Sequence, residues 1–281
     1  MCIRDSPEVF GKYGADASRQ WAATGGSTGT DIPFRWVDVE YGWRFMRKLW
    51  NACVFASAQL GGFDPETEAE PELLDRWILS RLERVVKIAT EEFEGCRYMN
   101  ATEAVRNFVW HVFCDHYLEA AKHRLYSEGE EKASTQGTLL YVTRRILQLL
   151  APVMPHITEE IYSAMYAEGE SESIHLSRWP EADESLISGE AEKRGDLIVA
   201  VIRDVRREKN RLGIPLNTPL KGLSIYAMDA EDAEILTWGI EDISATVKAD
   251  DVEVFEGRGG AYEVEGYPGV CFSIPTGTDG T

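Results

Sequence analysis

Four stretches between residues 73 and 166 carry apolar side chains at every third or fourth position, and this spacing is the strongest constraint on the fold. Such a period matches one face of an α-helix and predicts four amphipathic helices. Pro152 ends the third stretch because proline lacks an amide donor, and Pro155 suits the first turn of the fourth. Since every apolar face needs a partner and the connections are short, we expect a mainly α fold built on an antiparallel helical bundle. The apolar positions are Leu74, Trp77, Ile78, Leu82, Val85, Ile88, Ala89 and Phe93; Ala101, Ala104, Val105, Phe108, Val112, Phe113, Tyr117, Ala120, Ala121 and Leu125; Leu139, Val142, Ile146, Leu149 and Leu150; and Ile157, Ile161 and Met165.

Weaker signals flank these four stretches. A short helix is predicted over residues 15–23 and a longer one over 41–60, which Gly61-Gly62 ends. The segment 64–72 has five acids and two prolines and is typical of a solvated linker. Residues 190–212 predict a further helix. Strand-like runs at 223–226, 252–255 and 270–274, around a helical piece near 231–238, indicate a small α+β unit.

The charge balance excludes some classes of partner. The 281 residues contain 48 Asp+Glu against 29 Lys+Arg, a net charge of −19, which argues against a general binder of DNA or membrane surfaces because both are anionic. No apolar run reaches the roughly 18 residues of a membrane span, and no secretory signal is visible. Five widely spaced cysteines without a C-x-x-C pair indicate a reducing, cytoplasmic location.

Motifs for catalysis or metal binding are missing from the sequence. No phosphate-binding P-loop, dinucleotide fingerprint, zinc-protease motif or nucleophile elbow occurs. The loop Gly25–Gly29 lacks the lysine of a phosphate cradle and favours a flexible turn. We therefore predict no catalytic residue and no metal ligand, and we interpret the possible metal cluster as helix packing: His111, Cys114, Asp115 and His116.

Basic residues nevertheless cluster beside aromatic ones. Arg44, Arg47 and Lys48 lie within one turn of each other, next to Trp43 and Trp50. Further groups occupy the first bundle helix and the segment 203–211. Cations interleaved with aromatics suit single-stranded RNA, whose bases stack on flat side chains while cations hold the phosphates. The alternative is a solvated helix face with i,i+4 ion pairs, as in a helical scaffold that binds no RNA, and spacing alone leaves both open.

Several blocks of the sequence occur in a fixed order: residues 13–25 (YGADASRQWAATG), 29–34 (GTDIPF), 44–52 (RFMRKLWNA), 75–82 (DRWILSRL), 108–119 (FVWHVFCDHYLE) and 150–162 (LAPVMPHITEEIY). In this order they resemble the valyl-tRNA synthetase family of class I aminoacyl-tRNA synthetases, in an archaeal-like version. The last three resemble the anticodon-binding bundle that the valine, isoleucine and leucine enzymes share. Ser18 stands where the family usually has leucine, and residues 228–281 match poorly.

This resemblance implies a valine--tRNA ligase, in which valine and ATP (with Mg) form valyl-adenylate and the valyl group then passes to tRNA. The chain lacks the family's His-Ile-Gly-His and Lys-Met-Ser-Lys-Ser signatures and its editing domain. We therefore expect a tRNA-binding C-terminal part that is inactive by itself and binds neither DNA nor membrane. The alternatives are an isoleucyl- or leucyl-tRNA synthetase fragment and a free-standing tRNA-binding module.

The resemblance also implies domains and contact residues. We expect a non-native scar at 1–6, a stem-contact remnant of the catalytic domain at 7–62, the anticodon-binding bundle at 73–166, and a small acidic α+β appendage at 190–281. A truncated edge should expose apolar groups near Trp21, Ile32, Phe34 and Trp36. The candidate RNA-binding residues are Arg44, Arg47, Lys48, Trp50 and Asn51 for the inner corner of the tRNA, and Arg76, Arg81, Arg97, Tyr98, Asn100 and Arg106 for the anticodon stem and loop.

Overall fold

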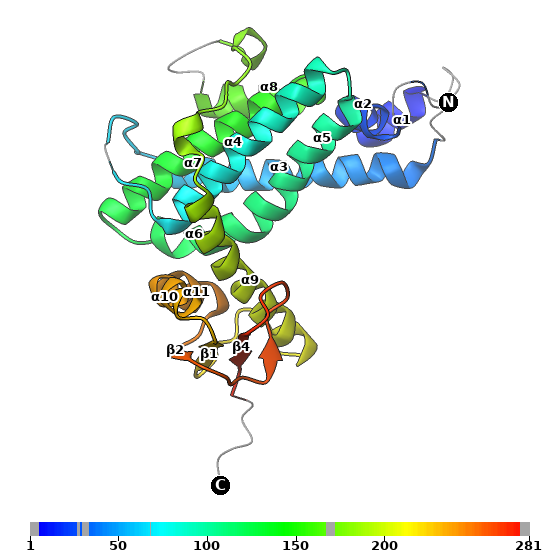
Figure 1. The fold of residues 1–281 in the computed structure, drawn as a ribbon. Helices are drawn as coiled ribbons and strands as arrows, with labels where there is room; N and C mark the ends of the chain where they lie inside the picture. The colour runs from blue at the N-terminus through cyan, green and yellow to red at the C-terminus, as the bar shows by residue number, and fades with distance from the viewer. Residues whose placement is uncertain (1–5, 27–28, 30–33, 68, 167–171, 276–281) are drawn as a thin grey trace. The chain divides into compact units, whose positions relative to one another are not determined.

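The computed structural model describes residues 6–26, 29, 34–67, 69–166 and 172–275. Its described residues are mainly helical, with one small sheet, so the predicted fold class is confirmed. The chain packs into two compact units (Figure 1). The first, which we call the helical unit, comprises Met1–Glu70, Ile78–Asp115 and Ala133–Ile187; the second, the α/β unit, comprises Pro71–Trp77, His116–Lys132 and Ser188–Thr281. The domain ranges expected from the sequence stay a prediction.

The helical unit is built from seven helices of the described chain, two of which begin in the other unit. They are α1 (Ser6–Tyr13), α2 (Ala15–Thr24), α3 (Trp36–Gln59), α4 (Leu73–Glu94), α5 (Tyr98–Asn107), α7 (Glu130–Leu150) and α8 (Pro155–Tyr166). Short 3₁₀ turns follow at Ile174–Leu176 and Glu184–Leu186. Helix α3 begins at Trp36, five residues before its predicted start; the periodic pattern did not reveal this first turn because Trp36 and Val37 are exposed.

The stretch predicted as one helix over residues 101–125 has three parts. Helix α5 continues into wide π-helical turns at Phe108–Tyr117, and α6 (Leu118–Leu125) then resumes the ordinary pitch. Each π-helical hydrogen bond spans one residue more than an α-helical bond, which shifts the faces of the helix. A pattern search with a period of 3.6 cannot register this change, since the side chains it counts, such as Phe113 and Tyr117, remain buried.

Helix α2 joins the ends of two other helices in the helical unit. The buried Asp16 carboxylate accepts a hydrogen bond from the Ile157 amide at 2.7 Å, which caps the N-terminus of α8. One turn later, the Arg19 guanidinium donates to the carbonyls of Pro152 (2.9 Å) and Val153 (3.0 Å), just past the end of α7. Ser18, which stands where the family usually has leucine, is buried between them. Its hydroxyl donates a hydrogen bond to the Gly14 carbonyl at 3.2 Å, so this polar group is not left unpaired in the core.

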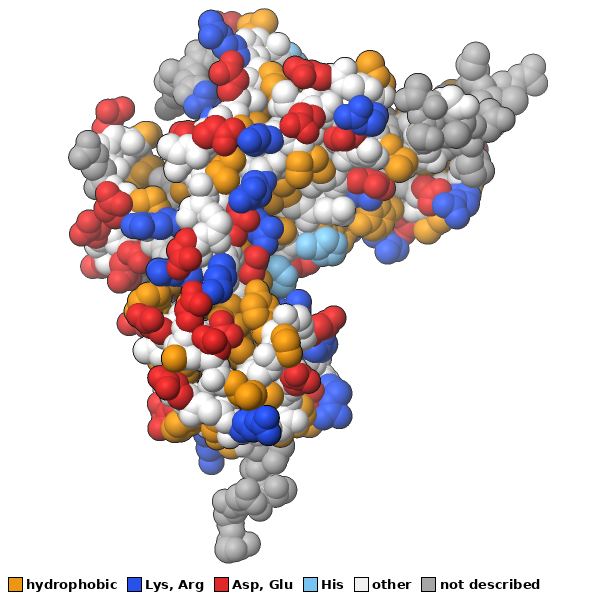
Figure 2. Space-filling view, viewed as in Figure 1, with side chains coloured by type: hydrophobic (Ala, Val, Ile, Leu, Met, Phe, Trp, Pro, Cys, Tyr) orange, Lys and Arg blue, Asp and Glu red, His pale blue; other side chains and the backbone are white. Residues whose placement is uncertain are grey.

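The α/β unit contains α6, a long helix α9 (Gly189–Arg211) and a four-stranded sheet. Its strands are β1 (Leu223–Ala227), β2 (Val252–Glu256), β3 (Tyr262–Glu263) and β4 (Val270–Ser273), in the order β2-β1-β4-β3. Strand β1 pairs parallel with β2 and antiparallel with β4, and β3 pairs antiparallel with β4. Figure 2 shows acidic side chains along the α10 and β2 side of this unit.

The connection between β1 and β2 contains two helices, α10 (Ala230–Trp238) and α11 (Ile240–Val247), that pack against α9. Strands β1, β2 and β4 and helix α10 confirm the sequence signals. Strand β3 and helix α11 gave no signal, because one has two residues and the other follows directly on Gly239. Within the described ranges, no helix combines the length and the apolar character needed to cross a bilayer.

Candidate nucleic-acid interface

Three cations on α3 have different surroundings. Arg44 donates to the Glu40 carboxylate at 2.6 Å, one turn earlier on the helix. Lys48 contacts Asp115 at 2.5 Å, and its ammonium lies 4.4 Å from the centroid of the Trp110 ring. Both charges are therefore already balanced by carboxylates, which lowers their contribution to binding an anion.

Arg47 differs from its neighbours because it has no carboxylate partner among the described residues. Its guanidinium carbon lies 4.8 Å from the Trp43 ring centroid, which orients the group without neutralising it. Arg47, Trp50 and Asn51 line one shallow cavity of about 290 Å³, together with Trp43. Trp50 is 42% exposed, so this cavity offers a cation, an indole face and an amide to solvent.

The turn between α4 and α5 holds a second predicted group. Cys96 adopts a left-handed conformation with φ of 56°, which reverses the chain and begins α5 at Tyr98. Glu92 accepts hydrogen bonds from Arg97 at 2.7 Å and from Asn100 at 2.8 Å. These two bonds lower the pKa of the Glu92 carboxyl, so it is ionised at neutral pH and occupies both donors.

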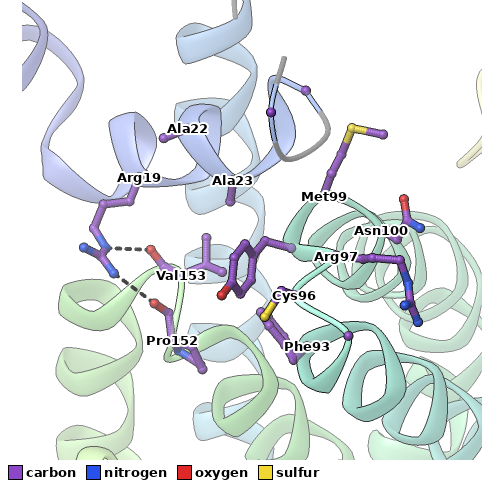
Figure 3. A pocket seen from close by; sticks show the side chains of 14 residues that line it. Arg19, Ala22, Ala23, Phe93, Cys96, Arg97, Met99, Asn100, Pro152 and Val153 are labelled. Atoms are coloured by element: carbon purple, nitrogen blue, oxygen red, sulfur yellow. Dashed lines mark hydrogen bonds between the residues drawn. The ribbon is translucent and has the colours of Figure 1, made fainter. Parts of the chain in front are cut away.

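A cavity of about 910 Å³ adjoins this turn and is shown in Figure 3. Arg19 lies on one side of the cavity, and Met99, Asn100 and Arg97 lie on the other. Tyr98, which is 49% exposed, also lines it. This volume lies within the range of sites that take small molecules, and a flat exposed phenol beside cations suits an unstacked base.

Arg19 and Phe93 also line this cavity, although the sequence did not indicate either of them as a binding residue. Helix α2 packs against α5, and this contact brings Arg19 to a turn about 80 residues later in the chain. A basic residue in an apolar helical segment was the available signal, but spacing within α2 cannot reveal which turn it faces. Gly26 and Gly29 of the Gly25–Gly29 loop also line the cavity, while positions 27 and 28 lie outside the described residues.

The other predicted residues are not gathered with these two groups. Arg81 belongs to the helical unit, and Arg76 belongs to the α/β unit, where its Nε donates to the Pro71 carbonyl at 2.7 Å. The Arg106 side chain is only 14% exposed and lies over the Tyr41 ring at 4.7 Å. Its burial leaves little of the guanidinium accessible to a phosphate.

The basic segment 203–211 consists mainly of internal ion pairs. Arg203 contacts the buried Asp204 at 2.8 Å, Arg207 contacts Glu265 at 2.5 Å, and Arg211 contacts Glu208 at 2.5 Å. Lys209 is fully buried and donates to the carbonyls of Leu216, Thr218 and Val247. This segment is therefore better described as a helix face whose cations are paired with carboxylates than as an RNA-binding surface.

Two further expectations can be compared with the described residues. Trp21 is 8% exposed and packs edge-on against Phe34 at 5.3 Å, so the expectation that it is exposed is wrong. Trp36 is 38% exposed, and Ile32 lies outside the described residues. Across the described ranges, no group of three or more His, Cys, Asp and Glu side chains is placed to hold a metal ion.

Comparison with known proteins identifies a family over most of the bundle. Residues 75–225 match the model of the anticodon-binding domain of tRNA ligase. The chain is 45% identical over 253 residues to the valine--tRNA ligase of Methanothermobacter thermautotrophicus and 43% identical over 256 residues to that of Pyrococcus abyssi. Each match covers 89% of this chain and 28% of the relative, so the chain spans just over a quarter of their length.

A solved structure has a similar fold. The crystal structure of the ternary complex of Agrobacterium radiobacter K84 agnB2 LeuRS, tRNA and LeuAMS aligns with a TM-score of 0.50 at 20% identity, covering 66% of this chain and 22% of that one. The helical architecture, the family match over residues 75–225 and the archaeal relatives agree with one another. The chain belongs to the family of the anticodon-binding domain of tRNA ligases.

Proposed function

We propose that this chain binds tRNA and is the anticodon-binding, C-terminal part of a cytoplasmic valine--tRNA ligase. The observation that carries the proposal is the cavity at the α4–α5 turn, where Tyr98 and two arginines surround a space large enough for a nucleotide. This turn lies inside the region that matches the family model. In the whole ligase, valine and ATP with Mg would bind elsewhere, because this chain carries neither nucleotide-binding signature.

The two predicted groups would have separate roles on the tRNA. In the cavity, the exposed Tyr98 ring would stack on an unpaired base of the anticodon loop. On α3, Arg47 would hold a phosphate at the inner corner of the tRNA while Trp50 and Asn51 contact the adjacent nucleotide. Arg44 and Lys48 would contribute less, since each is paired with a carboxylate.

A matched pair of variants on α3 tests this assignment. Arg47→Gln removes a cation that has no carboxylate partner, whereas Arg44→Gln removes one that Glu40 already balances. We expect Arg47→Gln to weaken binding of a valine-accepting tRNA transcript about five-fold at 0.1 M salt. This is the effect of losing one phosphate contact, which lowers the slope of log K against log salt by about 0.7 for a single strand, over the decade between 0.1 and roughly 1 M salt. Arg44→Gln should change it less than two-fold. Equal effects in fluorescence anisotropy would contradict the assignment.

Glu92 provides a second test, in which a substitution is expected to tighten tRNA binding rather than to weaken it. Since its carboxylate occupies Arg97 and Asn100, Glu92→Gln should free both donors for RNA and remove a repelling charge. We expect tighter binding by a few-fold, with Glu94→Gln on the same exposed helix end as the control for net charge. Unchanged binding by Glu92→Gln would show that the tRNA does not reach this turn, and weaker binding would contradict the competing role assigned to Glu92.

Cys96 lies at the rim of the same cavity and allows a test without mutation. It is exposed, whereas burial raises the pKa of Cys53 and Cys114 to about 12 and suppresses their reaction. Saturating tRNA should slow alkylation of Cys96, measured by peptide mass spectrometry, and leave the slower reaction of Cys271 unchanged. A chain that binds no tRNA, or a Cys96 that tRNA does not protect, would rule out the cavity as the site.

A further inference from the structure

A second groove in the helical unit contains three arginines that neither the sequence motifs nor the comparisons assign. It has a volume of about 530 Å³ and lies between α7 and the segment after the 3₁₀ turn Ile174–Leu176. Arg144 and Arg145 come from α7, and Arg178 comes from the later segment. The lining residues therefore include three arginines and one carboxylate-bearing residue, Glu181, in a chain with a net charge of −19.

Arg145 is held in place by neutral partners. Its guanidinium donates to the Glu181 backbone carbonyl at 2.8 Å and to the Tyr141 hydroxyl at 2.9 Å, and it lies 4.9 Å from the Tyr141 ring centroid. Tyr141 in turn donates to Glu83 at 2.9 Å. Burial, aided by Glu83, raises the pKa of Tyr141 to about 12, so the hydroxyl keeps its proton and this arrangement persists at neutral pH.

The remaining walls suit a nucleic-acid strand. Phe63, Pro65 and Thr67 form an uncharged side, while Arg178 is exposed and makes no ion pair within the described part of the chain. Gln148 donates to the Arg178 carbonyl at 3.3 Å, which ties that segment to α7. Arginines alternating with aromatic side chains are the arrangement that follows a single strand, with cations on phosphates and rings beside bases.

The groove is connected to the cavity at the α4–α5 turn through two aromatic rings. Trp179 lines the groove and Phe93 lines the cavity, and their ring centroids are 5.4 Å apart in an edge-on contact. The Trp179 indole also donates to Thr90 on α4 at 2.8 Å, which fixes the position of this contact. The cavity and the groove are therefore neighbours in the helical unit, separated by these two rings.

We propose that this groove binds the phosphodiester backbone of the RNA strand that flanks the base held in the Tyr98 cavity, with Arg144, Arg145 and Arg178 as the phosphate contacts. This inference rests on the proposed function, because it requires that the chain bind tRNA. It adds a second contact surface, which sets the direction of the strand across the helical unit. An acidic protein segment is the competing occupant, and a tRNA affinity and salt slope unchanged by glutamine substitution of these arginines would favour it over RNA.

The experiment measures tRNA affinity of the full chain as a function of salt. The double variant Arg144→Gln/Arg178→Gln removes two phosphate contacts and leaves the hydrogen bonds of Arg145 to Glu181 and Tyr141 intact. At about 0.7 per contact for a single strand, the slope of log K against log salt should fall in magnitude by roughly 1.4. If the lost contribution vanishes near 1 M salt, binding should weaken roughly 25-fold at 0.1 M and about five-fold at 0.3 M.

Two further variants control for charge and for folding. Lys221→Gln/Arg258→Gln removes the same charge from exposed positions of the α/β unit and should leave both affinity and slope within error. Arg144→Lys/Arg178→Lys keeps the charges and should retain most of the slope. Circular dichroism melts should coincide for all variants.

The outcomes separate this inference from the proposed function. If the wild-type chain binds tRNA and the glutamine pair leaves affinity and slope unchanged, the groove does not contact RNA, and this inference fails while the proposed function stands. An equal loss in the control pair would attribute the effect to net charge and would also overturn it. A wild-type chain without affinity for tRNA would overturn both.

Discussion

Replacing Arg124 by methionine should strongly destabilise the α/β unit, because this arginine neutralises two buried carboxylates. Its guanidinium, 4% exposed, contacts Asp75 at 3.3 Å and also donates to Asp242. Asp75 is fully buried and accepts a hydrogen bond from the Tyr117 hydroxyl at 2.8 Å, while Asp242 lies 2.8 Å from the His123 ring. Burial, reinforced by Asp75, raises the pKa of Tyr117 well above its ordinary value, so Tyr117 remains a donor.

The magnitude follows from what remains after the substitution. Removing one partner of a buried ion pair costs about 3–5 kcal/mol, because the other charge is left without compensation. Here two carboxylates lose their cation, but Asp75 keeps Tyr117 and Asp242 keeps His123. We therefore expect a loss near the lower end, about 3 kcal/mol, which corresponds to a fall in the melting temperature of roughly 10 °C for a unit of this size.

Urea unfolding followed by circular dichroism measures this change, and a double-mutant cycle assigns it. The variant Arg124→Met/Asp242→Asn removes one of the uncompensated charges and should recover about 1–2 kcal/mol relative to Arg124→Met alone. Arg35→Met, whose ion pair with Asp38 is largely exposed, is the matched control and should cost less than about 1 kcal/mol. If Arg124→Met cost no more than Arg35→Met, the reasoning about a desolvated network would be refuted.

Two further predictions concern packing and pH. Gly195→Ala should cost about 1–3 kcal/mol of stability, because a β-carbon there would lie 2.3 Å from the Trp77 ring. Gly189→Ala on the same helix is the control: its β-carbon would meet nothing within 4 Å, so it should be neutral or slightly stabilising. Equal effects of the two variants in thermal melts would contradict the packing argument. Burial raises the pKa of Cys53 and Cys114 from 9.0 to about 12, so the folded state holds these protons more tightly than the unfolded chain. The free energy of unfolding should therefore be unaffected below pH 9. Above pH 9 it should fall by roughly 1.4 kcal/mol per thiol for each pH unit. At pH 10 the loss from both thiols is about 2.7 kcal/mol, and it should disappear in Cys53→Ala/Cys114→Ala; a double variant with the same alkaline slope would exclude these thiols as the cause.

Local pattern was sufficient for most elements of this chain. The helices α4, α7 and α8 and the strands β1, β2 and β4 appear where periodicity predicts them, since the spacing of apolar residues is a local property of the sequence. Within α4 the predicted stripe was wrong at Ile88, which is 46% exposed, and it missed Val86, which is fully buried. The π-helical turns at Phe108–Tyr117 were missed because they keep the same residues buried while changing the hydrogen-bond spacing. The strand β3, with two residues, is too small to carry a pattern of its own, and α11 was missed because it follows directly on Gly239, where α10 ends.

Charge clusters were predicted less well than elements. The basic groups at 44–48 and 203–211 have similar sequences. In the structure, however, Arg47 forms no ion pair with a described carboxylate, whereas cations of 203–211 form ion pairs with Asp204, Glu208 and Glu265. Glu265 lies more than 50 residues from its partner, and no spacing rule connects them. Whether a surface cation is available for RNA depends on such distant carboxylates.

By itself, the sequence determined the helical class, the positions of most helices and the membership of a tRNA-ligase family, because these depend on short-range periodicity and on ordered local blocks. Only the tertiary structure decided which cations remain available, that Arg19 lines the same cavity as Cys96, and that Trp179 of the groove contacts Phe93 of that cavity. The physical reason is that availability for binding is set by long-range contacts, and in this chain partners such as Arg19 and Val153 lie more than 130 positions apart.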